Sequence, residues 1–113
     1  MRIFFTEEMW DATVAGKKSE TTRDHQKALG VYDACTGSWH NPKSVKVRGT
    51  IEITSNGETT WSIQLGRFRR EGFDSIEQFK EFAKRTGLDR YASAPHLYRH
   101  EYILTAQSSS LEK

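Results

Sequence analysis

The sequence predicts an α+β fold, and three observations support this. Short runs rich in β-branched and aromatic residues recur along the chain, as strands require. Two segments, 6–16 and 74–87, have apolar residues at helical spacing between residues that start and stop helices. Helices do not alternate regularly with the strands, which argues against a parallel sheet.

One domain is expected, over residues 1–104, because 113 residues suit a single core and show no linker or internal repeat. Residues 105–113 are polar and rich in serine, so we expect a disordered tail there. Its Leu111-Glu112 pair resembles residues left by cloning.

The composition excludes several classes of protein. The chain has 17 Lys and Arg against 15 Asp and Glu, so a net charge of +2 says little about partners. A single cysteine, Cys35, excludes an intramolecular disulfide and is expected to be a small buried hydrophobe. The apolar start is too short for a signal peptide, and no window has the length of a membrane span. We therefore expect a cytoplasmic protein.

No cofactor or metal is expected from the motifs present. The chain has no glycine-rich phosphate loop of either common pattern. His96 and His100 are four residues apart, but on a strand they lie too far apart to chelate one ion, and there is no second cysteine to complete a structural zinc site.

The N-terminal elements are expected to be a strand at 3–5 followed by a helix. Thr6 offers a capping hydroxyl, and two glutamates follow it, where carboxylates favour the start of a helix. Gly16 is expected to end this helix in a left-handed conformation.

Residues 19–23 follow the helix and contain poor helix formers, so they are expected to be extended. Because side chains alternate along a strand, Thr21 and Arg23 would share one face and Thr22 would take the other.

The middle of the chain is expected to be mainly β-structure, with loops at 24–30 and 36–43 and a tight turn at Asn56-Gly57. Over the whole sequence, the expected strands are 3–5, 19–23, 31–35, 44–54, 59–65 and 96–104.

A second helix is expected between an irregular basic segment at 66–72 and a loop at 88–94. Asp74 is the expected cap, with Glu77 three residues later completing a capping box. Gly87 is expected to end the helix.

Three segments together resemble the ASCH family. Residues 16–23 match its Gly-x-Lys-x-x-Thr-x-Arg signature after a short helix. Residues 71–73 read Glu-Gly-Phe before the second helix, and an acidic-aromatic pair, Glu101-Tyr102, lies in the last expected strand. The resemblance implies a PUA-like β-barrel with two main helices, and a cleft beside the barrel that binds RNA or a modified nucleoside.

One branch of that family, the small bacterial N4-acetylcytidine amidohydrolases, resembles this chain in size and signature. The resemblance implies a catalytic group of Lys18, Thr21 and, less directly, Glu71. The chemistry is coherent, because a threonine hydroxyl needs a base, and a lysine can be that base if burial and a nearby cation depress its pKa. Glu71 would protonate the leaving amine or orient Lys18, and Arg23 would stabilise an oxyanion or bind phosphate.

Basic residues elsewhere offer further contacts for a substrate. Arg67, Arg69 and Arg70 surround Phe68, a pattern that can follow a phosphate backbone and stack a base. Lys17 adds a cation beside the signature lysine. A second basic group consists of Lys43, Lys46 and Arg48.

Other interpretations stay open at this point. Lysines after a helix and a carboxylate in a loop can be ordinary surface residues. The alternatives to an amidohydrolase are a non-catalytic RNA-binding module and a single-strand ribonuclease of the same fold. A monomer is expected in each case.

Overall fold

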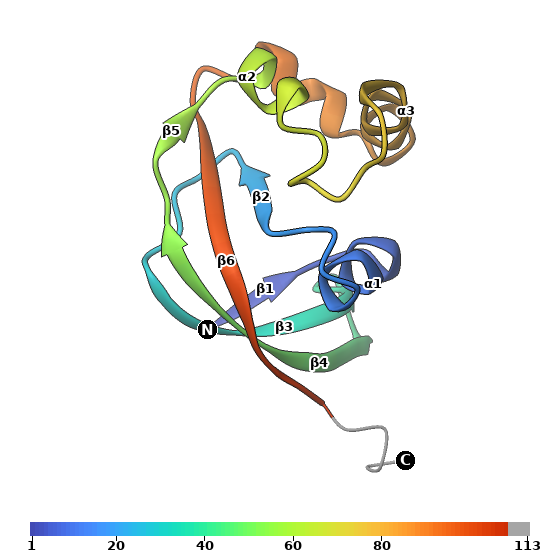
Figure 1. The fold of residues 1–113 in the computed structure, drawn as a ribbon. Helices are drawn as coiled ribbons and strands as arrows, with labels where there is room; N and C mark the ends of the chain where they lie inside the picture. Colours follow the sequence, from blue (N-terminus) through green and yellow to red (C-terminus); the bar gives the residue numbers. More distant parts are fainter. Residues whose placement is uncertain (109–113) are drawn as a thin grey trace.

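A curved sheet organises the computed structural model, which describes residues 1–108. Five strands follow the order β1-β3-β4-β6-β2, and a short β5 pairs with β6 (Figure 1). The pair β1–β3 is parallel and the other pairs are antiparallel. The strands are β1 Arg2–Phe4, β2 Glu20–Arg23, β3 Gly30–Ser38, β4 Asn41–Ser55, β5 Glu58–Thr59 and β6 Leu97–Gln107.

The sheet curls into a half-barrel, with β1 and β2 at its two ends. The helices are α1 Glu7–Val14, α2 Trp61–Gly66, α3 Ile76–Thr86 and the 3-10 helix η1 Leu88–Ser93. The expected α+β class with two main helices, α1 and α3, is confirmed, although the sheet is an open half-barrel rather than a closed barrel.

Two groups of elements flank β2. In Figure 1, α2, α3 and η1 gather at one end of the molecule, and α1 lies toward the end of β3 and β4. The core between them is strongly aromatic, and its buried members include Phe5, Trp10, Phe73, Phe79 and Tyr102. None of the helices in residues 1–108 is long and apolar enough to cross a membrane.

The expected loop at 36–43 is wrong, because β3 and β4 continue as a hairpin through most of it. Only residues 39–40 form the turn. The Ser44 hydroxyl accepts from the Ser38 backbone N–H at 3.0 Å and donates to the Asn41 carbonyl at 2.7 Å. These side-chain hydrogen bonds order the turn, although Gly37, Asn41 and Pro42 are typical of a loop.

The expected strand at 59–65 is also wrong. Residues 58–59 form β5, which pairs with β6, and the chain then turns into α2. The Thr60 hydroxyl caps α2 by accepting from the Ile63 N–H at 3.2 Å. Trp61 and Leu65, four residues apart, both pack on the core, whereas Ile63 is exposed. The apolar period is therefore helical rather than alternating.

Two element ends also differ from expectation. The cap of α3 is Ser75, not Asp74, since the Ser75 hydroxyl accepts from the Gln78 N–H at 3.1 Å. The last strand extends to Gln107, so the first three residues of the expected tail belong to β6, and Ala106 and Gln107 pair with β4. The rest of that expectation, including Leu111-Glu112, lies outside the described residues apart from Ser108. Residues 88–93, expected as loop, form η1.

Candidate active site

Lys18 and Glu71 meet although 53 residues separate them in the chain. Gly16, with φ 79°, turns the chain after α1, and Lys18 then forms an isolated antiparallel bridge with Glu71. Gly72 has φ 103°, and a Cβ added there would lie 3.1 Å from the Lys18 Cβ. The glycine after Glu71 thus permits the close approach of the two segments.

The two side chains form a buried ion pair. Lys18 Nζ lies 3.3 Å from Glu71 Oε1, and both side chains are no more than 5% exposed. Nζ also donates to the Glu20 carbonyl at 2.8 Å and to the Glu71 carbonyl at 3.1 Å. Burial lowers the pKa of Lys18, and the nearby Arg23 cation acts in the same direction, while Glu71 opposes both.

The second carboxylate oxygen of Glu71 accepts two more hydrogen bonds. Thr22 Oγ1 donates to Oε2 at 2.6 Å, and Gln64 Nε2 donates to it at 2.7 Å. Both oxygens of Glu71 therefore act as hydrogen-bond acceptors. In this arrangement Glu71 can orient Lys18.

Thr21 and Arg23 lie together on the other face of β2. Arg23 Nε donates to Thr21 Oγ1 at 3.3 Å, and Arg23 Nη2 donates to the Phe4 carbonyl at 2.7 Å. The guanidinium stands 5.8 Å from the centre of the Phe5 ring. The expected alternation is confirmed, because Thr21 bonds to Arg23 while Thr22 bonds to Glu71. Within residues 1–108, Lys18 and Thr21 share no hydrogen bond.

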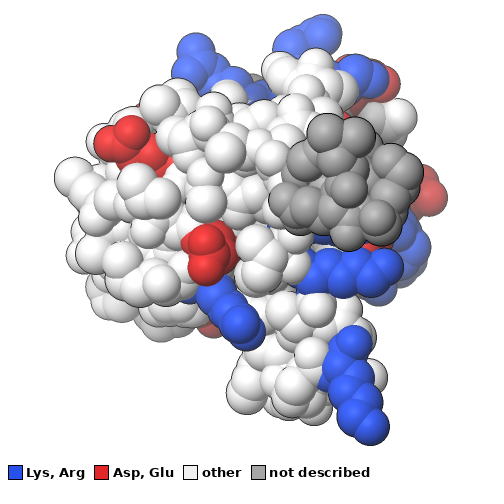
Figure 2. All heavy atoms as spheres, turned by 90° about the horizontal axis from the view of Figure 1, so that it is seen from below, with Lys and Arg blue, Asp and Glu red and all other residues white. Residues whose placement is uncertain are grey.

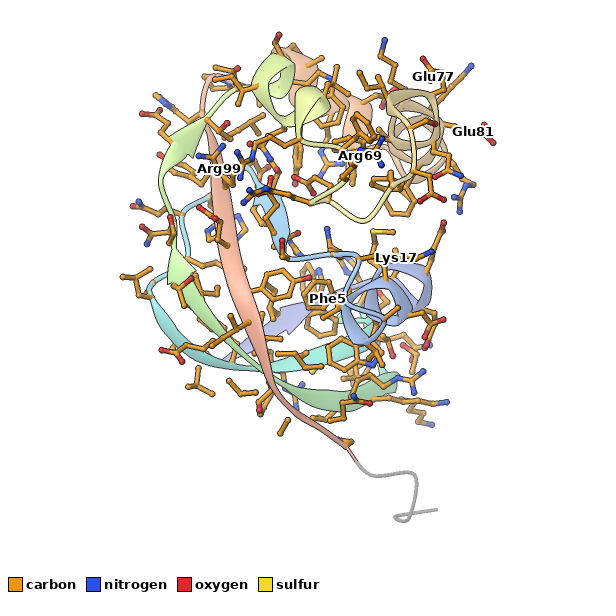
Figure 3. The ribbon with its side chains drawn as sticks, viewed as in Figure 1. Phe5, Lys17, Arg69, Glu77, Glu81 and Arg99 are labelled. Carbon is orange, nitrogen blue, oxygen red and sulfur yellow. The ribbon has the colours of Figure 1, made fainter. Side chains whose placement is uncertain are left out.

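Both faces of β2 border one cavity of about 240 Å³. Its polar lining includes Lys18, Thr21, Arg23 and Glu71, and most of the rest is apolar. Aromatic rings dominate that apolar part, and Figure 3 shows one of them, Phe5, in the interior beside α1. The aromatic lining residues are Phe4, Phe5, Trp61, Phe73, Phe79, Phe82 and Tyr91. Such a cavity, slightly below the range of about 300–1,000 Å³ for drug-sized ligands, suits a small planar molecule.

The other basic residues proposed as substrate contacts do not line this cavity. Lys17 is exposed at the end of α1 (Figure 3). Arg67 binds Glu20 in a bidentate pair, with Nη2 2.8 Å from Oε1 and Nε 3.0 Å from Oε2. Arg69 is exposed over the Phe68 ring at 5.2 Å, and Arg70 lies 3.9 Å from Glu101.

Three buried residues join the site that sequence reasoning did not assign to it: Glu20, Thr22 and Gln64. Glu20 is adjacent to the signature threonine, but its burial depends on Arg67 from a distant segment. Gln64 lies in α2, which was expected to be a strand. The alternation of side chains along residues 19–23 predicted which face of the strand carries Thr22, but it could not predict that Thr22 bonds to Glu71.

The two histidines considered for a metal have different surroundings. His96 is exposed, and its Nδ1 lies 2.7 Å from Glu58 Oε2. His100 is fully buried, and its Nε2 accepts the Lys27 backbone N–H at 2.9 Å. Cys35 is buried as expected, and burial raises the pKa of its thiol.

Comparison with solved structures identifies the fold. Protein EF3133 from Enterococcus faecalis V583, which carries the family designation DUF984, superposes with a TM-score of 0.58. The match covers 99% of this chain and 80% of that protein, at 13% sequence identity. The fold is PUA-like. No protein-family model and no curated protein matches the sequence. At this identity the PUA-like fold is what the comparison supports, and function has to be argued from the site.

Proposed function

We propose that this protein is a small amidohydrolase that removes the acyl group from an N4-acetylcytidine-type nucleoside. The observation that carries the proposal is the convergence of a buried Lys18–Glu71 ion pair and a Thr21–Arg23 pair on one aromatic-lined cavity. A nucleobase offers flat faces for the aromatic walls, and its acylamino group would meet the polar end.

Thr21 is the nucleophile in this proposal. Its Oγ1 attacks the acyl carbon, and Lys18 in its neutral form takes the hydroxyl proton. Because Nζ has three acceptors around it, Lys18 must give up one of these bonds to turn a lone pair toward Thr21. Burial and the Arg23 charge, which lower the pKa of Lys18, favour the neutral form that this step needs.

The tetrahedral intermediate then collapses. Arg23 stabilises the oxyanion, and the Lys18 ammonium returns the proton to the leaving nitrogen, which releases the cytidine. Water, deprotonated by Lys18, attacks the acyl ester on Thr21. The bond from the acyl carbon to Thr21 Oγ1 breaks, the Lys18 ammonium returns the proton to Oγ1, and the carboxylic acid leaves. Because both of its oxygens accept hydrogen bonds, Glu71 holds Lys18 in place, and this orienting role is favoured over proton donation.

The direct test is to incubate the protein with N4-acetylcytidine and follow the release of cytidine and acetate. Thr21→Ala should lower kcat/KM at least about 1,000-fold, since losing a nucleophile removes the covalent route. Thr54→Ala is the matched control, because Thr54 is an exposed strand threonine outside the cavity. Full activity in Thr21→Ala would rule out the threonine mechanism.

A second candidate function is RNA binding without catalysis. The observation that favours it is the exposed Arg69 stacked over Phe68, close in sequence to the site. Against it, Arg67 is occupied by Glu20, and on the face in Figure 2 Lys and Arg are scattered, with uncharged and acidic side chains between them. If the folded protein releases no cytidine, binding of single-stranded RNA that weakens with salt would support this candidate.

A further inference from the structure

Gln64 lies at the centre of the buried polar network, although it does not line the cavity. It belongs to α2 and is 0% exposed. Its Nε2 donates one hydrogen bond to Glu71 Oε2 at 2.7 Å and one to Glu20 Oε2 at 2.8 Å. Two carboxylate oxygens from different parts of the chain therefore share one amide nitrogen.

The orientation of the amide is fixed from its other side. Gln64 Oε1 accepts from Thr59 Oγ1 at 2.9 Å and faces Arg99 Nη1 at 3.4 Å. A reversed amide would turn its NH₂ toward the Arg99 donor and its oxygen toward two carboxylates. The hydrogen bonds thus determine which end of the amide faces Glu71.

Two buried carboxylates this close to a common atom normally compete, and one of them takes up a proton. Each here has its own cation: Glu20 has Arg67, and Glu71 has Lys18. The two N–H groups of Gln64 give each carboxylate a further donor at the point where the two come closest. The charged groups around Glu71 are thus Lys18, Glu20 and Arg23, all from the segment 18–23, and Arg67 at the end of α2.

We propose that Gln64 is a positioning residue of the candidate active site, whose amide keeps Glu71 ionised and fixed against Lys18 by donating to both buried carboxylates. This role rests on the proposed amidohydrolase function. A protonated Glu71 would lose its attraction for Lys18, and Nζ would no longer be held at the cavity that Lys18 and Thr21 both line.

Gln64→Glu is the most informative variant, because it keeps the shape of the side chain and puts an oxygen in place of the NH₂ group. A third carboxyl group then lies beside those of Glu20 and Glu71. At acid pH the new carboxyl is protonated and still donates a hydrogen bond. As the pH rises it ionises, repels Glu71 and Glu20, and disorders Lys18. We expect the ratio of its kcat/KM to that of the wild type to fall about 10- to 100-fold from acid to alkaline pH.

Gln64→Leu, which removes the donor at every pH, should lower kcat/KM by a similar factor throughout. Gln26→Leu is the matched control, since Gln26 is an exposed loop glutamine. A merely structural role for Gln64 would lower activity in Gln64→Glu by the same factor at all pH values, and that result would overturn the proposal.

A second readout does not need the enzymatic activity. Carboxyl-carbon NMR titration of Gln64→Leu should show Glu20 or Glu71 taking up a proton at higher pH than in the wild type. If the wild type hydrolyses nothing, the proposed function fails while this titration still tests Gln64. Identical titrations in both proteins would refute the positioning role. Should Gln64→Leu not fold, Thr59→Val, which frees one side of the amide, should shift the titration in the same direction.

Discussion

At the scale of single residues, burial strongly perturbs His100, which does not line the cavity. It is fully buried on β6, and its Nε2 accepts the Lys27 backbone N–H, which requires that nitrogen to be unprotonated. Burial lowers the pKa of His100 from 6.5 to about 4, and the neighbouring Arg23 and Lys27 cations act in the same direction. The imidazole is therefore neutral in the folded protein at pH 7.

This shift predicts an acid-sensitive stability. Above pH 6.5 His100 is neutral in both states, and its full contribution is present. As the pH falls from 6.5 to 4, the unfolded state binds a proton that the folded state resists, so the free energy of unfolding drops by about 3 kcal/mol. Urea denaturation at pH 7 and pH 4 should show a smaller drop in His100→Gln than in the wild type.

The exposed His25 provides the control for that measurement. His25→Gln should follow the wild-type pH dependence, because the His25 side chain is 68% exposed. An equal acid loss in His100→Gln and the wild type would show that other groups cause it.

The same scale shows how much of the site can be predicted from sequence. The faces of Thr21, Thr22 and Arg23 follow from strand alternation alone. Only the family resemblance grouped Glu71 with Lys18, and the sequence did not show that their side chains meet. Glu20 and Gln64 could not be assigned, because a buried polar residue is recognised by its partners, and these come from segments 44 and 47 residues away.

At the scale of elements, two neighbouring residues, Asp74 and Ser75, have different roles at the start of α3. Ser75 Oγ accepts from the Gln78 N–H, whereas Asp74 contributes through its backbone, which donates to Gln78 Oε1 at 2.9 Å. Both residues are common helix caps, so the pattern at 74–77 fits either of them. The backbone geometry, with Ser75 extended at φ −152° and ψ 160°, decides between them.

The two residues should therefore respond differently to substitution. Ser75→Ala removes the capping acceptor and should lower the free energy of unfolding by about 1 kcal/mol. Asp74→Ala leaves the backbone bond in place and should cost less. Chemical denaturation at pH 7 measures both, and a larger loss in Asp74→Ala would mean that the cap lies one residue earlier in solution.

Elements were predictable where local signals and packing agree. Thr6 and Gly87 marked helix boundaries correctly, since a cap is a local interaction. Residues 59–65 were misassigned because β-branched and aromatic residues favour a strand, while the core needs Trp61 and Leu65 on one side of a helix. Because of that misassignment, the buried position of Gln64 could not be predicted, since it depends on the α2 helix.

At the scale of the whole molecule, the cavity lies where separate parts of the fold meet. Its walls come from β1, α1 and β2 on one side and from α2, α3 and η1 on the other. A ligand bound there would contact both groups of elements, and since it binds only the folded state it would stabilise the protein as a whole.

Ligand binding should therefore raise the melting temperature. Thr21→Val is the protein to use, because it should bind N4-acetylcytidine without consuming it. At a ligand concentration of 100 Kd the stabilisation is about 2.7 kcal/mol, which raises Tm by roughly 10 °C in a domain of this size. Cytidine, which lacks the acyl group that the polar end would hold, should raise Tm less.

Two further substitutions in the Thr21→Val protein locate the binding site. Leu88→Trp places a larger side chain at the cavity wall and should abolish the shift in Tm. Trp39→Ala removes an indole that is 68% exposed on the β3–β4 turn and should leave the shift unchanged. The reverse pattern would mean that the nucleoside stacks on the exposed Trp39 and that the cavity is not its site. Loss of the shift in the cavity variant alone would place the ligand between the two groups of elements, where Lys18 and Arg23 can reach its acyl group.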